Sequence, residues 1–167
     1  YDKLIARYAF NYISTRSCLN FEETNKEARG NLIYVVKIYD GSFANVGRQP
    51  DYNLINMDRN RPFYTSVIIH EIFHALGRFH EHSRYDRDNY VRLNTENIID
   101  ELVSQFDKRP RKDDTFGVSY DINSIMHYPG NAFSKNGKNT LESVDPSLQY
   151  NMGQFTVPTI KDLLQLN

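Results

Sequence analysis

The chain has 167 residues, a length typical of one domain that can bury its own core. Hydrophobic residues make up 40% of it and charged residues 25%, proportions typical of a soluble globular protein. The net charge of −1 provides no strong field for nucleic acid, and no apolar run approaches the length of a membrane span. We therefore expect neither a nucleic-acid partner nor a membrane span.

The first part of the chain is predicted to combine one helix with three strands. Residues 2–16 are expected to form an amphipathic helix. Its apolar residues recur at helical spacing: Leu4, Ile5, Tyr8, Tyr12 and Ile13. A short strand is expected at 19–21, a buried strand rich in β-branched and aromatic residues at 31–39, and another strand at 52–58. Residues 41–51 contain glycine and proline and are predicted to be a loop.

A second helix is predicted over residues 63–75, with Pro62 at the position of a first-turn proline. Its expected core-facing residues are Val67, Ile68, Phe73 and Leu76.

The sequence HEIFHALGRFH, which begins at His70 in this helix, carries most of the chemistry. His70 and His74 share one face, because positions i and i+4 of a helix lie one turn apart. Glu71 points in an adjacent direction, from which it can reach a water on a metal. Gly77 can adopt the left-handed conformation that ends a helix, so His80 can approach the same point. Three neutral imidazoles leave a fourth position open for water, which is the arrangement of a catalytic zinc site.

The second half of the chain is predicted to be mostly irregular. A further helix is expected at 95–106, with its apolar residues on one side: Ile98, Ile99, Leu102 and Phe106. The basic segment 108–112 is expected to be a solvated turn, with a processing site or an anionic partner as the less favoured alternative. Asn136-Gly137 predicts a hairpin turn between 133–134 and 140–141. Residues 157–166 are expected to form a closing helix with Pro158 in its first turn.

Two motifs resemble those of the astacin family of metzincin endopeptidases. The run from His70 to Asp88 matches the family pattern H-E-x-x-H-x-x-G-x-x-H-E-H-x-R-x-D-R-D, and Ser124-Ile125-Met126-His127-Tyr128 matches the family's methionine turn. A looser similarity extends from about Tyr8 to the C-terminus. Serralysin-like enzymes share the first motif but usually lack the acid that follows the third histidine, here Glu81.

The resemblance implies an α+β, zincin-like fold in one peptidase domain spanning residues 1–167. An N-terminal lobe, about 1–80, is expected to contain a twisted mixed sheet and two long helices. A C-terminal lobe, about 81–167, is expected to be mostly irregular with a closing helix. The active-site cleft would lie between the two lobes.

The resemblance also implies roles for single residues. His70, His74 and His80 would bind one Zn²⁺ per chain, and Glu71 would be the general base and later the proton shuttle to the leaving amine. Tyr128 would ligate zinc at rest, then swing away and donate a hydrogen bond to the oxyanion of the tetrahedral intermediate.

Other residues receive supporting roles. Met126 would lie beneath the metal, Glu81 would anchor the mature N-terminus, and substrate would pair along residues 45–56. With three histidines on the metal, His82 and His127 are not expected to be ligands. The charged residues Arg84, Asp86 and Arg87 are predicted to form a local ion-pair network.

Both ends of the chain depart from the family pattern. The family usually has a strand-forming segment before its first helix, whereas here a helix is predicted almost from Tyr1. Of the usual four cysteines only Cys18 is present, and its customary partner would lie beyond Asn167. We therefore expect a domain trimmed at both ends, with the Glu81 anchor unoccupied and one disulfide absent.

The function that follows is a secreted zinc endopeptidase acting on protein or peptide substrates. It is expected to be a monomer, with a propeptide as an option in the precursor. One alternative is a catalytically impaired binding module on the same fold, and another is a zinc hydrolase of non-peptide amides.

Overall fold

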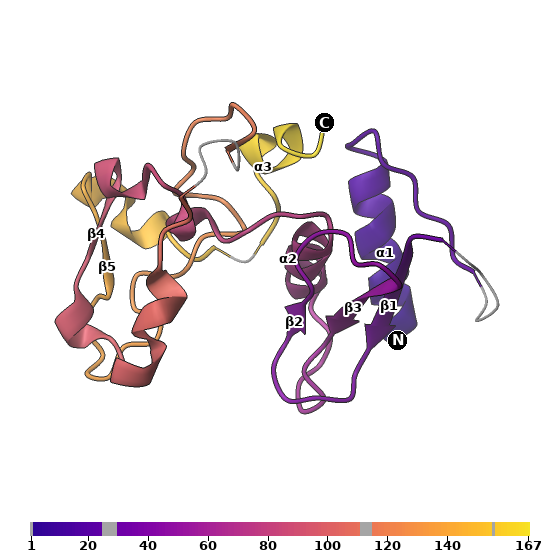
Figure 1. Cartoon of the computed structure of the whole chain (residues 1–167), viewed down its shortest axis with the longest axis horizontal. Helices are drawn as coiled ribbons and strands as arrows, with labels where there is room; N and C mark the ends of the chain where they lie inside the picture. The colour runs from indigo at the N-terminus through magenta and orange to yellow at the C-terminus, as the bar shows by residue number, and fades with distance from the viewer. Residues whose placement is uncertain (1, 25–29, 111–114, 155) are drawn as a thin grey trace. The chain divides into compact units, whose positions relative to one another are not determined.

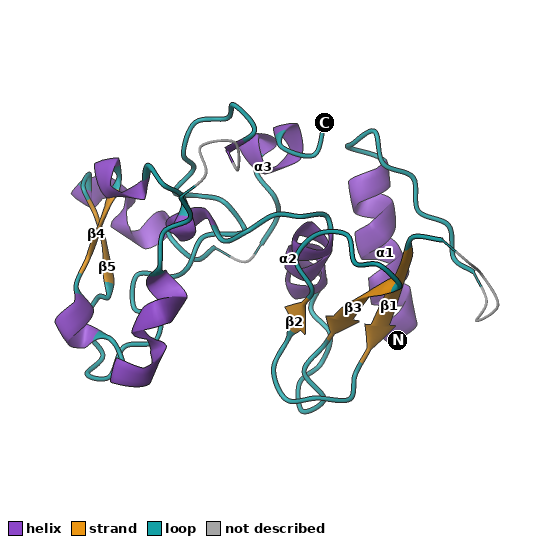
Figure 2. Ribbon diagram, viewed as in Figure 1, coloured by secondary structure: helices purple, strands orange, loops and turns teal. Residues whose placement is uncertain are grey.

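The computed structural model of the chain describes residues 2–24, 30–110, 115–154 and 156–167 (Figures 1 and 2). The chain divides into two compact units, one of Tyr1–Phe79 with Leu166–Asn167 and one of His80–Gln165. Among the described residues, no helix is long and apolar enough to cross a membrane.

The first unit contains a small mixed sheet and two helices. Its elements are α1 (Asp2–Ser14), β1 (Leu32–Val36), β2 (Phe43–Ala44), β3 (Tyr52–Asn56) and α2 (Thr65–Ala75). Strand β3 lies in the centre of the sheet, with β1 parallel to it on one side and β2 antiparallel to it on the other (Figure 2). The mixed sheet and the two long helices predicted for this part of the chain are confirmed.

The core of the first unit is built around α2, which packs against the sheet and against α1. Every residue of α2 from Ile68 to Ala75 is buried, so the helix has no solvent-facing side in this stretch. The predicted core residues Ile68 and Phe73 are fully buried, whereas Val67 and Leu76 are half-buried. The stretch of α2 that carries His70 and His74 is therefore buried, with α1 and the sheet packed against the helix.

The second unit consists mainly of short 3-10 helices and loops. Its elements are η1 (Glu81–Ser83), η2 (Arg87–Asn89), β4 (Val91–Leu93), η3 (Thr95–Asn97), η4 (Asp100–Phe106), β5 (Leu141–Ser143), η6 (Pro146–Asn151) and α3 (Ile160–Leu164). Strands β4 and β5 pair antiparallel, and a separate core gathers around them with Ile98, Phe106 and Leu141 fully buried. The predicted irregular segment with a closing helix is confirmed, although α3 is short.

Several predictions for the first unit are wrong in detail. Residues 19–21 form no strand, and the loop predicted at 41–51 contains the short strand β2. The strand expected at 31–39 is limited to β1, and its residues are half-buried or exposed instead of buried. The reason is that β1 is an edge strand, and Tyr34 on it is exposed and packs on Tyr52 of β3.

The prediction of a helix at 95–106 is also wrong, because the chain forms two 3-10 segments separated by an extended Ile98. The backbone of Ile98 pairs with Ser134, and the N–H of Ile99 donates to the carbonyl of Phe133. These contacts with residues 133 and 134 take the place of the backbone hydrogen bonds that a continuous helix would form within itself. A regular hairpin around Asn136-Gly137 is absent for the same reason, since the preceding residues pair with 97–99.

Two predicted helix starts are shifted along the chain. Helix α2 begins at Thr65, so Pro62 lies before the helix and not in its first turn. Helix α3 begins after its cap residue Thr159, which places Pro158 outside it as well. The basic segment 108–112 lies partly outside the described residues.

Candidate functional site

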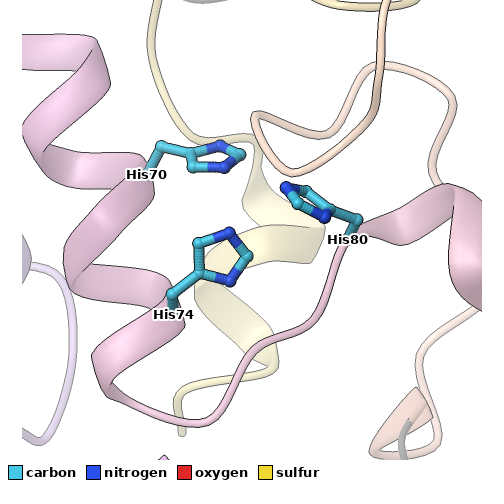
Figure 3. Close-up of side chains that lie close together, drawn as sticks. All are labelled: His70, His74 and His80. Atoms are coloured by element: carbon cyan, nitrogen blue, oxygen red, sulfur yellow. The ribbon is translucent and has the colours of Figure 1, made fainter. Parts of the chain in front are cut away.

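Three histidines of the described residues gather at one point, with their rings directed toward one another (Figure 3). One ring nitrogen from each of His70, His74 and His80 lies within 4.8 Å of the other two. His70 and His74 come from successive turns of α2, and their ring centroids are 4.7 Å apart. The predicted side-by-side placement of these two residues thus follows from the helix, and the three side chains are positioned to bind one metal ion.

His80 reaches this point because α2 ends at Ala75 and the chain reverses at Gly77. The N–H of Gly77 donates to the carbonyl of His74 (2.8 Å), and the N–H of Arg78 donates to the carbonyl of Phe73 (2.9 Å). This pair of bonds is the Schellman ending of a helix, which requires a left-handed residue. Gly77 has φ = 97°, as predicted for the residue that reverses the chain.

A hydrogen bond to the imidazole of His74 determines which of its two ring nitrogens can bind a metal. Its Nδ1 lies 2.7 Å from the carbonyl oxygen of Arg78. Because a carbonyl only accepts, Nδ1 carries the proton, and in the neutral ring Nε2 is the nitrogen whose lone pair can bind a metal. Burial also lowers the pKa of His74, which favours the neutral imidazole that a metal ligand must be.

Glu71 is buried one residue after the first histidine, with 5% of its surface exposed. Burial raises the pKa of its carboxyl group to about 8. Among the described residues its Oε2 atom has no hydrogen-bond partner. A bound cation nearby would favour the ionised carboxylate and lower this pKa again.

The methionine turn and Tyr128 lie in the second unit together with His80. The N–H of Glu81 donates to the carbonyl of the fully buried Met126 (2.9 Å), so the turn is bonded to the residue that follows His80. The ring of Tyr128 packs on the rings of His80 and His82, with centroid distances of 4.5 Å and 3.9 Å. Burial raises the pKa of the Tyr128 phenol, so that the phenol keeps its proton.

Asp162 of α3 holds the methionine turn, and the motif analysis did not identify it. Its carboxylate accepts hydrogen bonds from the hydroxyl of Ser124 (2.5 Å) and from the N–H of Ile125 (3.0 Å). It also completes a capping box with Thr159, whose N–H donates to it (2.9 Å). The spacing Thr-x-x-Asp at 159–162 is the signal that would have indicated the cap, but nothing local connects it to the turn.

The predicted ion-pair network is confirmed in part. Arg84 makes two bonds to the carboxylate of Asp86 (2.9 and 2.8 Å) and one to the Oε1 of Glu81 (3.1 Å). Arg87 pairs instead with Asp88 and donates to backbone carbonyls. Glu81, for which the family resemblance implies an N-terminal anchor, has in this structure a partner within its own unit.

Cys18 is exposed and forms no disulfide among the described residues. Its N–H donates to the side chain of Asn167 (2.7 Å). A disulfide partner beyond Asn167 stays a prediction.

His82 and His127 hydrogen-bond away from the histidine cluster. The Nε2 of His82 bonds to the carbonyl of Gln105 (3.1 Å). His127 bonds through Nε2 to the hydroxyl of Tyr120 and through Nδ1 to the carbonyl of Tyr128, both at 2.7 Å. Because Nδ1 must donate to the carbonyl, the tyrosine hydroxyl donates to Nε2, and the neutral ring satisfies both bonds.

We expect His127 to make the chain less stable in weak acid. Burial lowers its pKa to about 4 in the folded protein, against about 6.5 in the unfolded chain. Between these values the unfolded chain binds the proton more tightly, so the free energy of unfolding falls as the pH drops from 6.5 to 4. The loss from this one group is about 3 kcal/mol. Urea titrations of the metal-free chain at several pH values measure it.

Replacing His127 with Gln is the control for this pH dependence, because other acidic groups also titrate in this range. The variant is expected to lose less free energy of unfolding than the parent between pH 6.5 and 4, whatever its stability at neutral pH. Identical pH slopes for the two proteins would show that His127 does not cause the effect.

Comparisons with known proteins agree with this site. The family model described as Astacin, a peptidase family, matches residues 1–167. The chain is 36% identical to zinc metalloproteinase nas-6 of Caenorhabditis elegans, over 98% of the chain and 46% of that protein. It is 34% identical to the low choriolytic enzyme of Oryzias latipes, over 99% of the chain and 59% of that protein. The chain thus spans about half the length of these curated relatives.

A solved structure shows the same fold. High choriolytic enzyme 1, a hatching enzyme zinc-protease from Oryzias latipes, superposes with a TM-score of 0.89. The two are 30% identical, and the match covers 99% of this chain and 80% of that one. The α+β, zincin-like fold expected from the sequence is confirmed by this match.

Proposed function

The chain belongs to the astacin family of peptidases, and from this premise we propose that it is a secreted, zinc-dependent endopeptidase that hydrolyses peptide bonds in proteins. The observation that carries the proposal is the convergence of His70, His74 and His80 on one point, with the buried Glu71 directly after the first of them in the sequence. These three histidines would hold the ion, and a set of three neutral imidazoles is typical of zinc sites that activate a water.

Each residue has a defined task in this proposal. His70, His74 and His80 hold one Zn²⁺, which when bound supplies Lewis-acid chemistry by acidifying a water and polarising a carbonyl group. Glu71 accepts the proton of the attacking water and delivers it to the leaving amine. Tyr128 donates a hydrogen bond to the oxyanion that develops at the substrate carbonyl.

The surroundings of Tyr128 support its role. Its ring packs against His80, so the phenol belongs to the immediate neighbourhood of a proposed ligand. Because burial raises its pKa, the hydroxyl group keeps the proton that it must donate.

A catalytically impaired binding module is not favoured, because the three histidines, the glutamate and the tyrosine are all present. We further propose that the chain acts as a monomer on protein or peptide substrates and that its precursor carries a propeptide. The motifs argue against a non-peptide amide as substrate, and an activity assay separates the two classes.

We expect the purified protein to contain one zinc ion per chain and to cleave a denatured protein substrate. A chelator should abolish cleavage, and added Zn²⁺ should restore it, because the ion activates the water. Metal analysis by mass spectrometry and a gel-based cleavage assay measure both. Zinc binding without cleavage would favour the catalytically impaired binding module. Cleavage of small amides but not of peptides would favour a zinc hydrolase of non-peptide amides.

Replacing Tyr128 with Phe is expected to lower kcat by about 10²-fold while KM changes little, because the lost hydrogen bond forms only in the transition state. Steady-state kinetics on a fluorogenic peptide measure the two constants. The ring and its packing on His80 and His82 are retained in the variant, so the structure is not expected to change. An unchanged kcat would remove Tyr128 from the mechanism.

A further inference from the structure

A single buried amide, that of Asn53 in β3, connects the loop of residues 45–50 to the end of the metal-binding helix. Its Nδ2 donates to the carbonyl of Gly47 (2.7 Å) and to the carbonyl of Ala75 (3.2 Å), the last residue of α2. Its Oδ1 accepts from the N–H of Gln49 (3.1 Å). Asn53 is 6% exposed, so water does not compete freely for these bonds.

The loop in turn bonds to a proposed zinc ligand. The N–H of Gly47 donates to the carbonyl of His74 (2.9 Å), which also accepts from Gly77. The last carbonyl groups of a helix have no partner within it and must be satisfied from outside. At α2 the carbonyl of His74 accepts from Gly47 of the loop, and the carbonyl of Ala75 accepts from Asn53, whose Nδ2 also donates to the carbonyl of Gly47.

The loop also carries part of a surface pocket. Residues Asn45, Gln49, Pro50, Asp51, Tyr52 and Leu54 line a pocket of about 340 Å³. Two of the lining residues, Gln49 and Asn45, are tied to β3 by hydrogen bonds to Asn53 and Leu54. The position of this pocket relative to His74 is therefore set by the same contacts.

We propose that Asn53 is a positioning residue for the metal site, one that holds the end of α2, and with it the His74 imidazole, in the place required for zinc. It acts through the backbone of Ala75 and through the Gly47–His74 bond. The inference rests on the proposed function, because it takes the three histidines as the zinc ligands.

Asn56, three residues along the same strand, provides a matched control. It is fully buried, and its Nδ2 also donates to two carbonyl groups, those of Tyr39 (3.1 Å) and Gly41 (2.7 Å). Its Oδ1 accepts from the N–H groups of Ile38 and Tyr39. It thus fixes a loop in the same manner as Asn53, but none of these partners belongs to α2.

The experiment compares the variants Asn53→Asp and Asn56→Asp with the parent. Each change keeps the size of the side chain and turns two donated hydrogen bonds into contacts between a carboxyl group and carbonyl oxygens. Zinc affinity is measured by competition with a chromophoric chelator, after circular dichroism has shown that each protein is folded. If Asn53→Asp does not fold, Asn53→Ala, which introduces no charge, takes its place.

We expect Asn53→Asp to bind zinc about 10-fold more weakly than the parent, a loss typical of groups that orient metal ligands, and Asn56→Asp to stay within about twofold of it. Both variants are expected to be less stable, so stability alone does not explain the difference. Equal zinc affinities in the two variants would overturn the role of Asn53. A parent protein that binds no zinc would instead overturn the proposed function.

Discussion

Replacing Glu71 with Gln is expected to lower kcat/KM for peptide cleavage by about 10³-fold, because general-base catalysis typically contributes 10²- to 10⁴-fold. The amide has nearly the size of the carboxylate but cannot accept the proton of the attacking water. Glu71 is buried beside His70 and is not one of the three clustered ligands. Steady-state cleavage of a fluorogenic peptide measures the loss.

Zinc binding provides the control for this variant. Since the histidines are unchanged, Glu71→Gln should bind one zinc ion per chain with nearly the affinity of the parent. Loss of activity together with loss of zinc would show a structural role for Glu71. A fully active variant would rule out the general base assigned here.

Replacing Asp162 with Ala is expected to reduce the free energy of unfolding by about 4 kcal/mol, because several buried donors lose a charged acceptor at once. These donors are the hydroxyl of Ser124 and the N–H groups of Ile125 and Thr159. The carboxylate is 1% exposed, so water does not readily take its place. Urea-induced unfolding followed by circular dichroism measures the change.

Two further variants test the cause of this effect. Asp162→Asn keeps one oxygen acceptor and is expected to lose less stability than Asp162→Ala. Asp145→Ala removes an exposed carboxylate that accepts from Ser147 at the start of η6, and it should change stability little. If Asp162→Ala unfolds at the same urea concentration as the parent, Asp162 does not hold the methionine turn.

The histidine cluster could be predicted because its geometry is almost entirely local. The distance between His70 and His74 follows from the pitch of a helix, and Gly77 follows from the backbone conformation that ends one. The same local regularity predicted α1 and α2 to within a few residues. The motif that includes Tyr128 was found by resemblance, and the structure adds that its ring packs on His80.

Predictions failed where partners distant in the sequence decide the backbone conformation. The apolar spacing of residues 95–106 fits a helix, but the backbone of Ile98 pairs with Ser134 and breaks it. The composition of residues 31–39 fits a buried strand, but β1 lies at the edge of the sheet. The spacing of apolar residues predicts which side chains are buried, but it does not predict which segment of the chain packs against them.

The sequence by itself thus determined the family, the three histidines, the glutamate beside them and the glycine that ends the helix. Only the tertiary structure revealed how these residues are supported, by Asn53 on the end of α2 and by Asp162 on the methionine turn. The physical reason is the range of the interactions. Helix pitch and glycine conformation act within a few residues, whereas the amide of Asn53 and the carboxylate of Asp162 bond to groups 22 and 37 positions away.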